Sequence, residues 1–177
     1  MIKRLVIVVL GLVCTFQLSA EIKLSGIFGD NMVIQRDVPV MIWGWGDKGE
    51  SVTVHFNGQH RKTRVMKNGR WELELEKMPF GGPYDMTIVG RENTIRIGNI
   101  LIGDIWFCSG QSNMEFQVKE AYNAAGEIES ADYFMIRSLN VPRTINALPQ
   151  ENVKGQFCQI SGFPVFSLLC YTSVRLM

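Results

Sequence analysis

The sequence predicts a β sandwich followed by the beginning of an α/β domain. Between residues 21 and 98, short segments alternate apolar and polar residues, which is the pattern of half-buried strands. Two Asn-Gly dipeptides, at 57–58 and 68–69, separate such segments and are typical of tight β-hairpins. From residue 99 onward, a continuous apolar run and then a helical spacing of apolar residues replace the alternation. We therefore place a domain boundary near residue 98.

The first twenty residues, MIKRLVIVVLGLVCTFQLSA, precede the predicted β domain. Lys3 and Arg4 are followed by an unbroken apolar run from Leu5 to Val13 and, farther on, by Gln17-Leu18-Ser19-Ala20, which ends in small residues. This order is that of a secretory signal peptide cleaved after Ala20, so we expect a secreted or periplasmic protein. The apolar run is shorter than the roughly 20 residues that span a bilayer, and no stable membrane anchor is expected.

Residues 21–98 are expected to form about six short strands, as in a small β sandwich. In SVTVHF (51–56) and RWELELE (70–76) every second residue is apolar, so one face of each strand should be buried. The return strand of the first hairpin is expected at about 61–66. Further strands are expected in VPVMIWGWG, PYDMTIVG and NTIRI.

Residues 99–155 are assigned to the beginning of the α/β domain. The segment NILIGDIWFCSG (99–110) is largely apolar and predicts a strand buried on both faces of a parallel sheet. Residues 113–130 predict an amphipathic helix, and YFMIRSL (133–139) predicts a second buried strand. Strand, helix and strand would form one βαβ unit. Residues 156–177 form an atypical apolar tail in which Arg175 is the single charged residue.

Net charge, cysteine content and histidine spacing bear on the possible partners, disulfides and metal sites. The formal net charge is +1, which gives no indication of a nucleic-acid partner. Cys108, Cys158 and Cys170 follow the predicted signal peptide. We expect Cys108, at the end of an apolar strand, to be a buried free thiol. Neither a Cys-x-x-Cys nor a His-x-x-x-His spacing occurs, so no metal site is predicted.

The segment FCSGQSNMEF (107–116) places Ser112 on a bend between the predicted strand and helix. A serine hydroxyl becomes a nucleophile when a base takes its proton and nearby donors stabilise the oxyanion. Such a bend exposes the Oγ atom and directs free N–H groups of the helix toward negative charge. Gly110 lets the chain turn and a substrate approach. The spacing leaves two interpretations, because Ser112 and Asn113 can also simply cap the helix.

Two groups of segments resemble one known family. IGDIWFCSGQSNMEF resembles the nucleophile block of the sialate O-acetylesterases, a branch of the SGNH (GDSL-like) hydrolases. LSGIFGDNMVIQRDVPVMIWGWGDKGESVTVHFNGQ resembles the β domain that precedes this block in the same family, as do GGPYDMTIVG and NTIRIGNILIGDIW. The resemblance runs from about Leu24 to Asn152 and is specific, because separate segments agree in order and spacing.

The resemblance implies a serine esterase that removes O-acetyl groups from sialic acids or related acetylated sugars, without a metal or organic cofactor. Ser112 matches the nucleophile, and its backbone N–H would join the oxyanion hole. Gly110, Gln111 and Asn113 would line the turn and the substrate site. The reaction would pass through an acetyl-enzyme that water then hydrolyses.

The sequence departs from the family pattern after Ser112. The family has an Asp-x-x-His pair well downstream of its serine, and no histidine follows Ser112 here. We therefore expect an incomplete, N-terminal portion of an SGNH-type enzyme with little activity alone. The alternative is a non-catalytic carbohydrate-binding or interaction module built on the β domain.

Five further residues have two interpretations each. His55 and His60 are expected to be solvated surface residues rather than a replacement base for the serine. Trp43 and Trp45 are expected to pack in the sandwich core, and the alternative is a platform on which a sugar stacks. Arg137 can meet a sialate carboxylate through a bidentate bond or form a structural ion pair.

Overall fold

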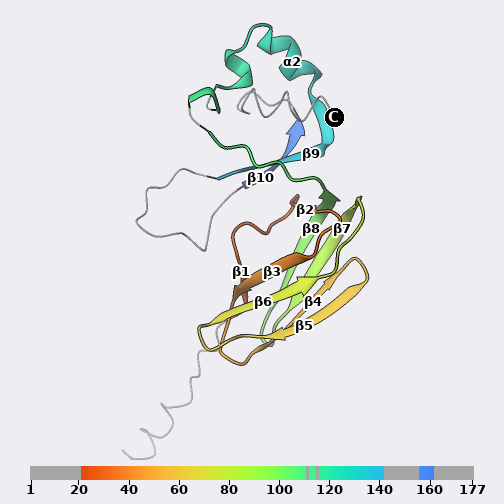
Figure 1. The fold of residues 1–177 in the computed structure, drawn as a ribbon, viewed down its shortest axis with the longest axis vertical. Coiled ribbons are helices and arrows are strands. Elements are labelled where there is room, and N and C mark those ends of the chain that lie inside the picture. Colours follow the sequence, from red (N-terminus) through yellow and green to blue (C-terminus); the bar gives the residue numbers. More distant parts are fainter. Residues whose placement is uncertain (1–20, 111, 115, 142–155, 162–177) are drawn as a thin grey trace, which may run out of the picture.

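The computed structural model describes residues 21–110, 112–114, 116–141 and 156–161. The predicted signal peptide, Gln111 and most of the apolar tail lie outside these residues. The described chain is mostly β structure in two parts, which Figure 1 shows one above the other: a two-sheet unit, and an upper part with α2, β9 and β10. The elements of the two-sheet unit are β1 (Lys23–Leu24), β2 (Val33–Gln35), β3 (Val40–Trp45), β4 (Ser51–Phe56), β5 (Gln59–Arg64), β6 (Arg70–Leu75), β7 (Gly81–Val89) and β8 (Thr94–Gly103).

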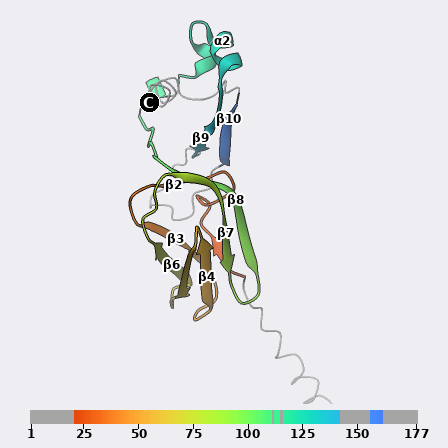
Figure 2. The ribbon, with the colours of Figure 1, turned by 90° about the vertical axis from the view of Figure 1, so that its right-hand side faces the viewer.

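The two-sheet unit contains a three-stranded sheet in the order β1-β3-β6 and a five-stranded sheet in the order β2-β8-β7-β4-β5. All pairs are antiparallel except β2 and β8, which run parallel. Figure 2 shows β3 and β6 on one side of the unit and β7 and β8 on the other. One hydrophobic cluster contains residues of both sheets, so the sheets share a core.

The predicted alternation in residues 51–56 and 70–76 is confirmed. Val52, Val54 and Phe56 of β4 are at most 2% exposed, and Trp71 and Leu75 of β6 are 0% exposed. Leu73, between these two residues of β6, is also buried, at 7%. The polar residues that alternate with the apolar ones in both strands are half-buried or exposed. Alternate residues of a strand point to opposite faces, so this pattern places one face of each strand in the shared core.

The first Asn-Gly turn is also confirmed. Asn57 has φ of 45° and Gly58 has φ of 76°, as in the hairpin turn that needs positive φ at both central residues. The second dipeptide behaves differently, because there only Gly69 has positive φ, at 79°. It precedes β6, which lies in a different sheet from β5, so this turn carries the chain between sheets.

Strand β8 runs through the boundary expected near residue 98. Its pairing with β7 skips from Met86↔Ile97 to Tyr84↔Ile100, so the strand bulges at residues 98 and 99. Asn99 has φ of 57°, a conformation that asparagine tolerates better than most residues. The bulge in β8 therefore lies at the position where we expected the boundary between two domains.

The expected buried strand over 99–110 is wrong beyond Gly103. Residues 104–110 have no strand structure and are exposed, with Phe107 at 92%. Residues up to 103 pair with β2 and β7, whereas none of the described strands pairs with 104–110. An apolar run indicates that a segment is suited to burial, but it does not indicate whether neighbouring strands are present to bury it.

The expected helix over 113–130 is broken into three pieces: η1 (Ser112–Met114), η2 (Val118–Glu120) and α2 (Ala124–Ser130). Ala121, after η2, is extended, and Asn123, before α2, is left-handed with φ of 58°. The side-chain carboxylate of Glu120 accepts a hydrogen bond from the Gln117 backbone N–H, as in a capping box. The apolar spacing was helical, but these backbone conformations interrupt the helix.

The second expected strand exists as β9 (Asp132–Asn140), but its partner differs from the prediction. It pairs antiparallel with β10 (Gln156–Ser161), the beginning of the apolar tail. The expected βαβ unit is therefore not formed within the described residues. Among those residues the structure also has no helix that is both long and apolar enough to cross a membrane.

Candidate active site

Ser112 is exposed at the first residue of the 3₁₀ turn η1. The preceding chain folds closely onto this turn, because a Cβ added at Gly110 would lie 2.6 Å from Met114 Cγ. Gly110 thus allows the close approach of the Met114 side chain beside the serine, and its role toward a substrate stays a prediction. Asn113 is the second residue of η1, and Gln111 lies outside the described residues.

Two hydrogen bonds, which we call the polar clamp, fix the chain just after the end of β8, where it begins to lead toward Ser112. The Arg36 Nε donates to Asp104 Oδ1 at 2.9 Å, and the Ile105 N–H donates to Gln35 Oε1 at 2.9 Å. The hydrogen bond from Arg36 lowers the pKa of the Asp104 carboxyl, and the same bond raises the pKa of Arg36. No local sequence pattern predicts this clamp, because only the parallel pairing of β2 with β8 brings these residues together.

Cys108 corrects an expectation. It is exposed rather than buried, and it is disulfide-bonded rather than a free thiol. A strand that was expected to bury this residue ends at Gly103. The segment between β8 and Ser112 is therefore held by the clamp at Asp104 and by a covalent bond at Cys108.

Arg137 on β9 reaches back to the bulge of β8. Its Nη1 donates to the Phe134 carbonyl, and its Nη2 lies 3.5 Å from Asn99 Oδ1. Burial lowers the pKa of its guanidinium, and its Nε has no hydrogen-bond partner among the residues that the structure describes. Within the described chain no carboxylate forms an ion pair with Arg137, so the structural ion pair is not found. Contact with a substrate carboxylate stays a prediction.

The two histidines contact each other and not the serine. His55 is half-buried and His60 exposed, and they face each other across β4 and β5. In both views β4 and β5 belong to the two-sheet unit, whereas the green segment that contains η1 lies in the upper part (Figures 1 and 2). Throughout the described part of the chain, no hydrogen bond to the Ser112 side chain is present.

Trp43 and Trp45 are not members of the buried cluster, which corrects the expectation of core packing. Both are half-buried and lie on the face of β3 opposite to Ile42, which is 0% exposed. The Phe28 ring meets Trp43 edge to face, with centroids 4.7 Å apart. The alternation of β3 makes the two tryptophans an outer-face pair.

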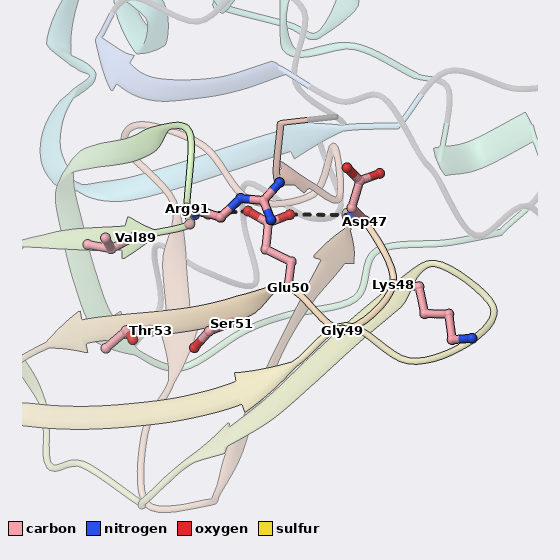
Figure 3. A pocket seen from close by; sticks show the side chains of 9 residues that line it. Asp47, Lys48, Gly49, Glu50, Ser51, Thr53, Val89 and Arg91 are labelled. Atoms are coloured by element: carbon pink, nitrogen blue, oxygen red, sulfur yellow. Dashed lines mark hydrogen bonds between the residues drawn. The ribbon is translucent and has the colours of Figure 1, made fainter. Parts of the chain in front are cut away.

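A hollow of about 430 Å³ lies on the two-sheet unit, between residues 47–53 and 89–91 (Figure 3). Glu50 is 5% exposed there, and its carboxylate accepts backbone N–H bonds from Arg91 at 2.9 Å and Asp47 at 3.3 Å. Glu50 therefore joins two loops. None of the residues predicted to act with Ser112 lines this hollow.

No protein-family model matches the chain. The sialate O-acetylesterase of Pongo abelii is 34% identical over 155 residues, which cover 77% of this chain and 29% of that protein. The sialate O-acetylesterase of Homo sapiens is 34% identical over 151 residues, covering 75% and 29%.

A solved structure is similar over an even larger share of the chain. A carbohydrate acetylesterase from Xanthomonas citri superimposes with a TM-score of 0.86 and 25% identity over 88% of this chain and 37% of that one. The chain spans about 29% of the length of the curated relatives named above. The sequence similarity to sialate O-acetylesterases extends over three quarters of the chain. The mostly β fold is similar to that of a carbohydrate acetylesterase. The chain therefore belongs to the sialate O-acetylesterase family.

Proposed function

We propose that this chain is part of a carbohydrate O-acetylesterase in which Ser112 is the nucleophile. The observation that carries the proposal is the 34% identity to sialate O-acetylesterases over more than three quarters of the chain. The exposed position of Ser112 at the first residue of a tight turn supports it, because a nucleophile must be reachable by its ester. The substrate class is O-acetylated sialic acid or a related acetylated sugar.

In the proposed reaction, the Ser112 Oγ attacks the acetyl carbonyl while a base takes its proton. Backbone N–H groups of the turn, with Gly110, Gln111 and Asn113 around it, would stabilise the oxyanion. The ester C–O bond then breaks, the sugar oxygen receives the proton, and the acetyl group stays on Ser112. Water attacks this acetyl-enzyme and releases acetate.

We place the base outside the described residues. The two histidines of the chain, His55 and His60, contact each other on β4 and β5. A serine without a base stays protonated at neutral pH and is a weak nucleophile. The 177-residue chain alone is therefore proposed to have little activity on acetyl esters.

We also propose a domain assignment for the two parts of the chain and a secreted or periplasmic location for the protein. The two-sheet unit would be a β sandwich, and the residues after it the beginning of an SGNH-type α/β domain. The TM-score of 0.86 to a carbohydrate acetylesterase supports this assignment. The disulfide at Cys108 supports export by the predicted signal peptide, because disulfides persist in oxidising compartments.

The test uses a chimera in which residues 1–141 continue into the remainder of the Xanthomonas citri acetylesterase. We expect the chimera to hydrolyse p-nitrophenyl acetate and O-acetylated sialic acid. Ser112→Ala should lower kcat/KM by about 10⁴-fold or more, since the nucleophile is lost. Ser109→Ala is the matched control, because this exposed serine lies three residues away, and it should keep most of the activity. Equal losses in the two variants would refute the assignment of the nucleophile.

A second candidate function is a non-catalytic carbohydrate-binding module. The outer-face pair Trp43 and Trp45 favours it, because aromatic side chains outside a core are available for stacking. Titration of the 177-residue chain with acetylated and unacetylated sialic acid distinguishes the two candidates. Binding that is lost in Trp45→Ala and unaffected by Ser112→Ala would favour the module.

A further inference from the structure

The hairpin of β4 and β5 carries a pair of histidines that the esterase proposal does not use. His55 and His60 lie directly opposite each other, one position from the closing pair Phe56↔Gln59. Their Nδ1 atoms are in direct contact. The ring centroids are 4.6 Å apart, with an interplanar angle of 77°.

A contact between two imidazole nitrogens restricts what lies between them. Two N–H groups would repel, as would two lone pairs, so the contact requires one shared proton or a cation that accepts both lone pairs. Neutral imidazole is among the commonest protein ligands of metal ions. The rings as placed fit a hydrogen-bonded pair, and a moderate separation of the two nitrogens would make them a pair of metal ligands.

The backbone holds the two side chains in place before any ion binds. Six residue pairs form the β4–β5 ladder, and Phe56, beside His55, is 2% exposed in the core. Asn57 and Gly58 close the turn in the left-handed region. Directly opposite residues of an antiparallel pair point to the same face, so both imidazoles project side by side from the same face of the hairpin.

The strand neighbours of the pair on the same face carry hydroxyl and amino groups. On the same face, Thr53 lies opposite Lys62, and Thr87 of β7 lies opposite His55. Within the described chain, no carboxylate bonds to either imidazole. A hard cation such as Ca²⁺ prefers oxygen ligands, whereas imidazole suits Zn²⁺, Cu²⁺ and Ni²⁺.

We propose that His55 and His60 form a two-histidine site for a divalent transition-metal ion of the zinc, copper and nickel class. The ion would replace the shared proton, with one nitrogen of each ring as ligand and water in the remaining positions. Metal–nitrogen bonds of about 2.0–2.1 Å require the two rings to move apart slightly. Side-chain rotation allows this, because His60 is exposed and His55 half-buried. Two protein ligands give moderate affinity, and the site is independent of Ser112.

The experiment is a calorimetric titration of the metal-free 177-residue chain, without an affinity tag, with NiCl₂. We expect one Ni²⁺ per chain and no heat from CaCl₂. His55→Gln and His60→Gln should each weaken binding about tenfold or more, because each removes one of two ligands held on a common scaffold. Lys62→Gln is the matched control on the same strand and face, and it should not weaken binding.

Three outcomes would overturn the proposal: no Ni²⁺ binding by the wild-type chain, wild-type affinity in both histidine variants, or a loss of affinity in only one of them. The last would mean that a single imidazole holds the ion. Urea denaturation of each variant verifies folding. If a glutamine variant fails to fold, a threonine, which favours strands, replaces it at the same position.

Discussion

The two-sheet unit and the segment after β8 use apolar residues in opposite ways. Trp71, on β6, is 0% exposed, whereas Phe107, four residues beyond the end of β8, is 92% exposed. Both lie in sequence that is suited to burial. In the two-sheet unit each strand pairs with a neighbouring strand of the described chain, whereas no described strand pairs with residues 104–110. Burial thus depends on available partners as well as on the hydrophobicity of a segment.

The largest difference in stability between the two regions is expected when one aromatic side chain is removed from each. Trp71→Ala should lower the free energy of unfolding by about 3–5 kcal/mol, because it leaves a cavity in the shared core. Phe107→Ala, on an exposed side chain, should change it by less than about 0.5 kcal/mol. Urea denaturation followed by far-UV circular dichroism measures both. A loss at Phe107 as large as that at Trp71 would show that this ring is buried in solution.

A smaller effect is expected from adding a methyl group at one glycine of each region. A Cβ at Gly44 would lie 1.9 Å from the backbone oxygen of Lys23, so Gly44→Ala should cost about 1–3 kcal/mol through overpacking. At Gly110 the nearest atom is Met114 Cγ, at 2.6 Å, and a side chain can move more easily than a paired strand. We expect Gly110→Ala to cost less than Gly44→Ala in the same denaturation assay. The reverse order would mean that the turn at Ser112 is the more rigid of the two.

Sequence patterns predicted these two regions unequally for a physical reason. The alternation of β4 and β6 and the turn at Asn57-Gly58 depend on neighbouring residues, so they could be predicted. The pairing of β2 with β8 joins residues 68 positions apart, and no local pattern encodes it. The outer position of Trp43 followed from the alternation of its strand, but aromatic character suggested the core.

The candidate site shows the same division. A short motif predicts its serine and glycine, and the structure places Ser112 in a 3₁₀ turn and Gly110 close to Met114 of the same turn. The disulfide of Cys108 could not be identified, because a cysteine beside an apolar run has the same local sequence whether free or bonded. The clamp of Arg36 and Asp104 depends on tertiary pairing and was missed for that reason.

The smallest expected effect concerns pH at this clamp. Arg36 lowers the pKa of Asp104 in the folded chain, so the bond contributes stability at pH values above the usual range of an aspartate. That contribution is lost as the pH falls through the lowered pKa and Asp104 becomes protonated. Hydrogen exchange should therefore become faster at the Ile105 amide on acidification, relative to amides of β6. Asp104→Asn should remove this additional pH dependence, and an unchanged dependence would exclude Arg36 and Asp104 as its origin.

The parallel pairing of β2 and β8 also has a consequence for the order of folding. The β4–β5 hairpin closes over two residues, whereas β2 meets β8 only after a long intervening chain has been confined. Closing a long loop costs more entropy, and non-local contacts form slowly. We expect the antiparallel hairpins to form early and the attachment of Asp104 to Arg36 to come late. During synthesis, the segment that carries Ser112 would then be positioned only after most of the two-sheet unit is in place.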